Sequence, residues 1–148
     1  MKKISLFIAM SLDGYIADSK GSVEWLTGQG NDEDNIDSYS EFVKDIDTVV
    51  THKQKKSSDK IHFVNKNPVE LIKELRKENG NGIWICGGAN LIQQLVRADI
   101  IDCYYITVIP TILGSGIRLF EKADHEIKLR LLKTQSYNGM MDLIYAKR

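Results

Sequence analysis

Two adjacent glycines, Gly87 and Gly88, interrupt the apolar sequence IWICGGANLI over residues 83–92. They follow a segment typical of a buried strand and precede a segment typical of an amphipathic helix. A helix N-terminus carries unpaired N–H groups and about half a positive charge, and glycine lets an anion approach this backbone closely. The pattern indicates either a phosphate-binding turn or a tight strand-to-helix turn without a ligand, and two glycines alone favour the second.

Three further segments place polar or glycine residues where a predicted strand ends. A carboxylate suits acid–base chemistry, whereas hydroxyl, imidazole and ammonium groups suit a phosphate. Each segment could equally be a plain turn. The carboxyl ends of parallel strands share one edge of a sheet, however, and ligands bind at that edge. The three segments are Asp13-Gly14, Thr51-His52-Lys53 and the loop from Gly114 to Gly116.

Strand and helix signals alternate through the middle of the chain, and strand signals follow at its end. The clearest helix covers residues 67–79, where Asn67 is the expected N-cap and Pro68 the first helical residue. Near the C-terminus, Asn138-Gly139 is a strong hairpin signal. This order predicts an α/β fold of three layers, in which a mostly parallel central sheet has flanking helices and a C-terminal antiparallel hairpin.

A shorter helix is predicted over residues 34–46, because apolar residues recur there at helical intervals. Asp34 or Asn35 is the expected N-cap. Asp37 would then lie in the first turn. There it is either an exposed residue that favours the helix dipole, or a carboxylate on an apolar face whose pKa is raised by desolvation.

Composition excludes several classes of protein. The 148 residues fit a single domain over 1–148, and the 20 basic residues balance 20 acidic ones, which argues against nucleic-acid binding. No apolar stretch reaches the ~18 residues of a membrane helix, and the N-terminal residues 1–10 are interpreted as a strand rather than a signal peptide. Cys86 and Cys103 lie in apolar segments, which predicts buried thiols in a reducing cytoplasm, and no cysteine spacing predicts a metal site.

In combination and in order, these segments resemble the dihydrofolate-reductase-like fold. They are most similar to the bacterial RibD C-terminal family, the reductase domain of riboflavin-biosynthesis deaminase/reductases. The resemblance covers most of the chain and rests on SLFIAMSLDGYIA, GSVEWL, DTVV, IWICGGANLIQQL, IDCYYITVIPTILGSGIRLF and SYNGMMDLIY.

The resemblance implies a cytoplasmic, NADPH-dependent oxidoreductase that forms a homodimer. Its type would be that of dihydrofolate reductase or 5-amino-6-(5-phosphoribosylamino)uracil reductase. The small-molecule substrate would be pterin-like or ribosylamino-pyrimidine-like. Hydride would pass from the nicotinamide to a C=N or C=O group of this substrate, and neither a nucleic acid nor a membrane would be a partner.

The resemblance also implies roles for individual residues. The backbone around Ala9 and the residue Ile16 would hold the nicotinamide, and Thr51 and His52 would meet the adenosine 2′-phosphate. The pyrophosphate would bind at the glycine turn, which comprises Cys86, Gly87, Gly88, Ala89, Asn90, Leu91 and Ile92. The positions that would face the substrate are Trp25, Asp37, Phe42 and Thr107.

Two carboxylates are candidate catalytic acids. A reductase that acts on a C=N bond must deliver a proton as well as a hydride, and protonation makes the carbon a better hydride acceptor. Asp13 lies at the tip of the first strand, and Asp37 lies on the helix that borders the substrate cleft in the related fold. Asp37 is favoured because a carboxylate on an apolar helix face can be desolvated and its pKa raised toward the working pH. Delivery of the proton by solvent is the remaining possibility.

One segment departs from the family pattern. Family members usually follow the DTVV strand with a MGRxTY-type motif, a helix and a second strand that ends like VVTHK. Here Val50 runs directly into Thr51, although a parallel crossover needs about 10–12 residues. The protein has either lost a helix and a strand between these residues, or carries a stretch there that the printed sequence lacks. A true loss removes residues expected to bind phosphate and favours the alternative of a degenerate ligand- or nucleotide-binding protein without turnover.

Overall fold

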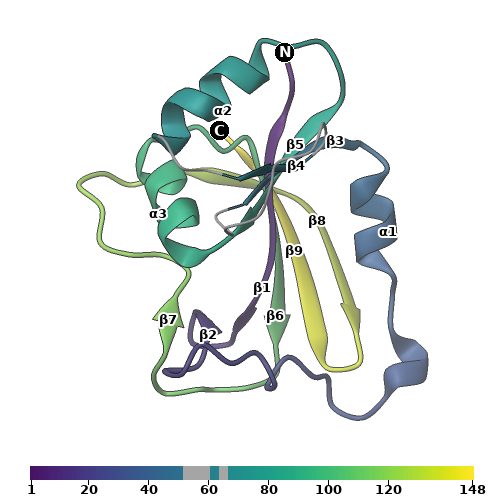
Figure 1. Cartoon of the computed structure of the whole chain (residues 1–148). Helices are drawn as coiled ribbons and strands as arrows, with labels where there is room; N and C mark the ends of the chain where they lie inside the picture. Colours follow the sequence, from purple (N-terminus) through teal and green to yellow (C-terminus); the bar gives the residue numbers. More distant parts are fainter. Residues whose placement is uncertain (52–60, 64–66) are drawn as a thin grey trace. The chain divides into compact units, whose positions relative to one another are not determined.

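A computed structural model describes residues 1–51, 61–63 and 67–148 (Figure 1). The predicted α/β class, with a mostly parallel sheet and a C-terminal antiparallel hairpin, is confirmed. The chain divides into two units, of which the first comprises Met1–Phe7 and Asp37–Cys103, and the second Ile8–Ile36 and Tyr104–Arg148. Strand β1 (Ile4–Ser11) contributes to both units, which are described in turn.

The first unit is built on parallel strands. Its hydrogen-bonded order is β4 (Ile61–Phe63), β3 (Ile46–Thr51), β5 (Gly82–Gly87) and the N-terminal half of β1. In the β3–β5 pair, Val50 lies opposite Ile85 and Thr51 opposite Gly87, so the carboxyl ends of the two strands lie side by side. The fully buried side chains of these strands are Ile4, Leu6, Val50, Ile83 and Ile85.

Helices α2 (Pro68–Arg76) and α3 (Ala89–Arg97) complete the core of this unit. Ile72 of α2 and Leu95 of α3 are fully buried, as their helical spacing requires. The predicted start of α2 is confirmed, because the Asn67 side chain accepts a hydrogen bond from the Val69 N–H at 3.0 Å and Pro68 is the first helical residue.

The prediction for helix α1 (Ser38–Val43) is wrong at its N-terminus. The N-cap is Asp37, not Asp34 or Asn35. Asp34 ends a short 3-10 helix (Asp32–Asp34), and Asn35 is the C-cap of that helix. The prediction rested on apolar residues at helical spacing, and this spacing continues beyond both ends of a helix that has only six residues.

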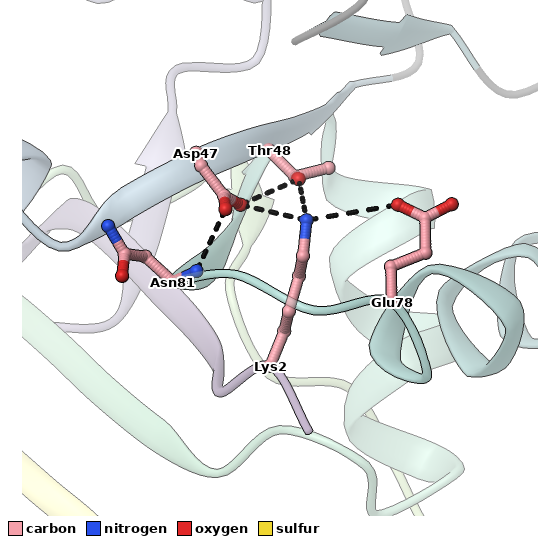
Figure 2. A network of polar contacts seen from close by, with 5 residues as sticks. All are labelled: Lys2, Asp47, Thr48, Glu78 and Asn81. Carbon is pink, nitrogen blue, oxygen red and sulfur yellow. Dashed lines mark hydrogen bonds and ion pairs between the residues drawn. The ribbon is translucent and has the colours of Figure 1, made fainter.

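At the amino ends of the strands of this unit, Lys2 forms a paired network (Figure 2). Its ammonium donates to Asp47 at 2.9 Å and to Thr48 at 2.8 Å, and Glu78 lies 3.9 Å away. Asp47 also accepts the N–H of Asn81 at 2.8 Å. The Lys2 side chain is only 6% exposed, so its charge is balanced inside the protein rather than by water.

The second unit contains the C-terminal half of β1, then β6 (Cys103–Ile109), β9 (Met140–Lys147) and β8 (Leu129–Tyr137) in hydrogen-bonded order. A separate antiparallel pair joins β2 (Tyr15–Ala17) to β7 (Ile117–Arg118). The predicted hairpin is confirmed. Tyr137 lies opposite Met140, which leaves Asn138 and Gly139 as a two-residue turn with φ angles of 49° and 75°.

The side chain of Asn138 ties this hairpin to the loop that follows β2. Its Oδ1 accepts the N–H groups of Gln29 at 3.1 Å and Asn31 at 2.6 Å. Its Nδ2 donates to Asp32 and Asn35, each at 3.0 Å. Asn138 is 4% exposed, and these bonds satisfy its amide in place of water.

Strand β3 runs without interruption through the junction between Val50 and Thr51. His52 and Lys53 lie outside the described residues, so the prediction for them is not addressed by the structure. The prediction of one domain lacking a helix and a strand at this junction stays a prediction. Among the residues that the structure describes, the longest helices have nine residues each, fewer than a membrane-spanning helix needs.

Candidate functional site

The glycine turn joins β5 to α3 in the first unit. Gly87 has a φ of +128°, a conformation that side chains disfavour, and its peptide bond to Gly88 is cis. The hydroxyl of Thr51 donates to the Gly87 carbonyl at 3.2 Å and so fastens the end of β3 to the turn. Backbone geometry therefore explains the glycine at position 87.

Position 88 has no such explanation. Gly88 has a φ of −75°, which any residue adopts, and a Cβ added there would meet no atom of the described residues within 4 Å. Neither backbone strain nor packing against these residues demands glycine at this position. Its small size leaves free space on the outer side of the turn, as the close approach of a ligand would require.

The N-terminus of α3 faces this free space without a side-chain cap. Gly88 is the N-cap, no acidic residue occupies the first turn, and the first helical hydrogen bond runs from the Ile92 N–H to the Gly88 carbonyl at 3.1 Å. The N–H groups before Ile92 have no acceptor within the helix. Helix α2 differs, because Asn67 caps it and Glu70 lies in its first turn. The turn before α3 therefore fits the phosphates of a nucleotide.

The side chains of the turn divide between core and surface. Leu91 and Ile92 are buried, so only their backbone is available to a ligand. Cys86 is exposed, and the prediction of a buried thiol is wrong there, whereas Cys103 is buried as predicted. The cause is alternation along β5, because Ile83 and Ile85 face the core and Cys86 points the other way. The two cysteines form no disulfide.

Thr51 has a different partner from the predicted one. Its side chain is buried, with the residue only 7% exposed, and its hydroxyl donates to Gly87. A hydroxyl has one proton, so it cannot donate to a phosphate while this bond is made. Thr51 positions the glycine turn, and the structure gives no support for its predicted contact with a 2′-phosphate.

Asp37 is exposed at the N-terminus of α1. Its carboxylate accepts both the Ser40 hydroxyl at 2.6 Å and the Ser40 N–H at 3.0 Å. These two hydrogen bonds, the hydroxyl first, lower the pKa of Asp37. The expectation of a raised pKa on an apolar face is therefore wrong, because this carboxylate caps the helix from its outer end.

Asp13 is held by hydrogen bonds in the second unit. Its Oδ1 accepts the Ser11 hydroxyl at 2.6 Å and the Leu113 N–H at 3.2 Å, and its Oδ2 accepts the Gly114 N–H at 2.9 Å. The Ser11 hydroxyl makes the largest contribution to a lowered pKa of Asp13, with burial opposing it and the two N–H groups adding to it. Asp13 thus fixes the glycine loop after β6, and both candidate acids are carboxylates with lowered pKa values.

Phe42 belongs to an aromatic cluster in the first unit. Its ring stacks on Phe7 with centroids 4.6 Å apart and meets Trp84 edge-on at 5.8 Å. Phe42 is only 6% exposed, and its predicted contact with a substrate stays a prediction. Tyr39 lies on the same cluster, with centroids 5.7 Å from Trp84, and is 51% exposed. The sequence did not predict Tyr39 as a residue available to a substrate, although Tyr39 lies one helical turn before Phe42.

Four predicted residues lie in the second unit. Ala9 in β1, Ile16 in β2 and Thr107 in β6 are half-buried. Trp25 is also half-buried, and its indole N–H donates to the Ser22 carbonyl at 3.1 Å. Their predicted contacts with nicotinamide and substrate stay predictions.

Thr107 has a partner that sequence reasoning missed. Its hydroxyl donates to Asp142 on β9 at 2.6 Å, and Asp142 is only 4% exposed. Gln135 and Tyr137 of β8 donate to the same carboxylate at 2.7 and 2.9 Å. The signal in the sequence was a single acidic residue within the apolar strand MMDLIY. Within the described part of the chain, no three histidine, cysteine or acidic side chains gather as a metal site.

Comparisons with known sequences identify a family and two relatives that match nearly the whole of this chain. The family model of the RibD C-terminal domain matches residues 34–142. The uncharacterized proteins YwjB and YyaP of Bacillus subtilis (strain 168) are 34% and 26% identical, over 99% and 97% of this chain and 98% and 94% of theirs. The alignment with YwjB is 173 residues long and this chain has 148, so at least 25 aligned positions have no counterpart here.

Solved structures show the same fold at lower identity. A protein of Shewanella sp. PV-4, provisionally named for riboflavin biosynthesis, has a TM-score of 0.84 at 23% identity and 99% coverage of both chains. The deaminase/5-amino-6-(5-phosphoribosylamino)uracil reductase of Thermotoga maritima has a TM-score of 0.72 at 12% identity, and this chain matches 57% of it and 99% of itself. Dihydrofolate reductase of Enterococcus faecalis has a TM-score of 0.64 at 14% identity, over 99% of this chain and 96% of that one. The fold is dihydrofolate-reductase-like, as the resemblance implied.

Proposed function

The chain belongs to the RibD C-terminal domain family, and from this premise we propose that it is an NADPH-dependent reductase. Its structural neighbours include reductases, which supports an oxidoreductase role. We propose a pterin-like or ribosylamino-pyrimidine-like substrate. The observation that carries the cofactor assignment is Gly88, where neither the backbone angle nor any contact with the described residues requires glycine.

The glycine turn would hold the pyrophosphate of the cofactor. Gly88 leaves space beside the first N–H groups of α3, and the helix dipole favours a negative charge there. Thr51 would keep the turn in place through its bond to Gly87. Ala9 and Ile16 remain the proposed contacts of the nicotinamide. The bound cofactor would supply the hydride, and the protein would orient it and exclude water.

We propose that water supplies the proton. Asp37 and Asp13 both have pKa values lowered by hydrogen bonds, so each carboxylate is ionised near neutral pH. An ionised carboxylate has no proton to donate. Asp37→Asn should therefore keep kcat/KM within about twofold of the wild-type value at neutral pH, because asparagine also caps helices well.

Cofactor titration tests this proposal most directly. Protein fluorescence would be followed as NADPH is added to the wild type and to Gly88→Val, and both proteins would be checked by circular dichroism. We expect saturable binding to the wild type and much weaker binding to the folded variant. No saturable binding of NADPH at millimolar concentration to the wild type would contradict the proposal. Equal binding to both proteins would show that the turn is not the cofactor site.

A preference for NADPH over NADH would test the 2′-phosphate contact separately. His52 remains the candidate for this contact, since the Thr51 hydroxyl is bonded to Gly87. A protonated imidazole favours a phosphate, so the preference should shrink in His52→Ala and above the pKa of histidine. Equal affinity of the wild type for both cofactors would remove this assignment.

A binding protein without turnover is the second candidate. It is favoured by the difference in length, because the alignment with YwjB contains at least 25 positions without a counterpart among these 148 residues. Loss of absorbance of NADPH, measured with dihydrofolate and with a ribosylaminouracil as acceptors, separates the two functions. Saturable NADPH binding without oxidation by either acceptor supports the binding protein, and oxidation supports the reductase.

A homodimer is also proposed, in keeping with the resemblance. Strand β8 ends the hydrogen-bonded order of the second unit, and Leu131 and Leu132 on it are 52% and 49% exposed. Exposed apolar groups on an edge strand favour association. Light scattering of the wild type and of Leu132→Lys would test this, with a dimer expected for the first and monomer for the second. A monomeric wild type would contradict the proposal.

A further inference from the structure

Asp142 is a buried carboxylate that accepts hydrogen bonds from three residues on strands of the second unit. Thr107 on β6 and Tyr137 on β8 donate to its Oδ1 at 2.6 and 2.9 Å. Gln135 on β8 donates to its Oδ2 at 2.7 Å. Asp142 is 4% exposed, whereas Thr107 is half-buried. The carboxylate is thus shielded from water, while the threonine in contact with it is accessible in part.

This arrangement fixes the direction of the Thr107 hydroxyl. A hydroxyl carries one proton and two lone pairs, and Thr107 gives its proton to Asp142. Only the lone pairs remain for a ligand. A group that approaches Thr107 must therefore be a donor, such as an amino, N–H or hydroxyl group, and a carbonyl oxygen there would leave a polar group unpaired.

We propose that Asp142 is a positioning residue that makes Thr107 a hydrogen-bond acceptor toward the substrate. This inference rests on the proposed function, in which Thr107 faces a pterin-like or pyrimidine-like ring. It narrows the substrate to heterocycles that present an amino or N–H group at this position. Asp142 itself does not touch the substrate. It affects which substrates bind because it accepts the proton of the Thr107 hydroxyl and leaves only the lone pairs of that hydroxyl for the substrate.

The isosteric substitution Asp142→Asn should reverse the direction of the hydrogen bond between residue 142 and the Thr107 hydroxyl. In Asp142→Asn the amide places its oxygen toward the Gln135 Nε2, which donates to this position in the wild type. The new NH2 group then lies at the former Oδ1 position, beside the hydroxyl of Thr107. The asparagine donates to Thr107, and the proton of Thr107 becomes available to a ligand. The variant should therefore favour acceptors where the wild type favours donors.

Two pteridines that differ only in their exocyclic groups serve as probes. 2,4-Diaminopteridine presents amino donors, and 2,4-dimethoxypteridine presents ether oxygen acceptors in the same places on the same ring. Kd values for both would be measured by fluorescence with NADPH present, for the wild type and for Asp142→Asn. We expect the wild type to bind the diamino compound about tenfold more tightly, and the variant to lose or reverse this ratio.

Variants of Thr107 distinguish positioning from a structural role. Thr107→Val should bring the ratio of the two pteridine Kd values near one. Asp142→Asn should not change this ratio further when it is combined with Thr107→Val. Thr107→Ser should keep the wild-type ratio. These threonine variants decide the question even where Asp142→Asn fails to fold. The inference is overturned if folded Asp142→Asn keeps the wild-type Kd ratio, or if Asp142→Asn changes this ratio equally in the presence of Thr107→Val. It is also overturned if neither pteridine binds. NADPH affinity is measured separately, and its absence would instead refute the proposed function.

Discussion

The two ends of the parallel strands in the first unit differ in whether their polar groups are paired within the protein. At the amino ends, the charge of Lys2 is enclosed and paired with Asp47, Thr48 and Glu78 (Figure 2). At the carboxyl ends, the turn at Gly88 opens α3 without a side-chain cap and leaves free space beside it. The first region satisfies its polar groups internally, and the second leaves them available.

This difference separates stability from function within one sheet. A buried ammonium that loses its partner is costly, so changes at Lys2 should act on folding. A glycine that the fold does not require should instead matter to whatever binds beside it. Four predictions follow this contrast, from the largest expected effect to the smallest.

Gly88→Val should weaken NADPH binding by about 100-fold, the equivalent of one or two charge-assisted hydrogen bonds. The valine would occupy the space proposed for the pyrophosphate, yet within the part of the chain that the structure describes its Cβ meets no atom within 4 Å. The thermal midpoint should therefore change little. Fluorescence titration and thermal unfolding on the same samples measure both quantities.

Gly82→Ala is the matched control, at the first residue of β5, the strand that leads to the turn. An added Cβ at Gly82 would lie 2.9 Å from the carbonyl oxygen of Asp45, so this variant should lose stability. The fraction that remains folded should bind NADPH with the wild-type Kd. A Gly88 variant that lost stability rather than affinity would break the comparison between the two ends.

Lys2→Met should lower the free energy of unfolding by about 2 kcal/mol. The figure is below that for a fully buried pair, because Asp47 is 35% exposed and regains water. NADPH affinity should stay at the wild-type value. Urea unfolding measures the loss, and Glu78→Gln is the control, since Glu78 is 61% exposed and its removal should cost less than about 1 kcal/mol. A weaker cofactor affinity in Lys2→Met would show that the two ends are coupled.

The sequence predicted the parts of this contrast that local signals encode. Asn67 and Pro68 correctly predicted the start of α2, and Asn138 with Gly139 correctly predicted the hairpin, because caps and tight turns depend on a few adjacent residues. The glycine turn was found in the same way, as a break between a strand pattern and a helix pattern.

The remainder depends on contacts between residues far apart in the chain. Nothing near Thr51 in the sequence indicates that Gly87 takes its proton, and nothing near Thr107 indicates Asp142. The exposure of Cys86 likewise depends on which face of β5 is covered. A periodic pattern shows that faces differ, but partners across a sheet are set by strand order and register.

Thr51→Val should have an intermediate effect on both properties. It keeps the shape of the buried side chain but removes the donor to the Gly87 carbonyl, which is made at 3.2 Å. We expect a loss of about 1 kcal/mol in the free energy of unfolding and a several-fold weaker affinity for NADPH, because the turn is less firmly held. Thr51→Ser, which restores the hydroxyl, should recover the affinity. Unchanged affinity in Thr51→Val would remove Thr51 from the support of the turn.

The smallest effect concerns pH and belongs to the amino ends alone. Burial alone would raise the pKa of Asp47, but hydrogen bonds from Lys2, Asn81 and Thr48, with the charge of Lys2, outweigh it and lower the pKa. A lowered folded-state pKa contributes stability above the unfolded value near 4, and this contribution is lost as the pH falls through the folded value.

The pH-dependent part of the difference in unfolding free energy between the wild type and Asp47→Asn should therefore be below about 1 kcal/mol, fully present at pH ~7 and lost below pH ~4. Urea titrations at several pH values measure it, and the other carboxylates cancel because both proteins contain them. The unfolding free energy of Gly88→Ala should show the same pH dependence as that of the wild type, since a Cβ at position 88 meets no side chain of the residues that the structure describes within 4 Å. If the difference for Asp47→Asn instead grew as the pH fell, Asp47 would have to be stabilised by a proton rather than by Lys2. The enclosed network would then not be an ion pair, and the contrast between the two ends of the sheet would have to be explained without charge.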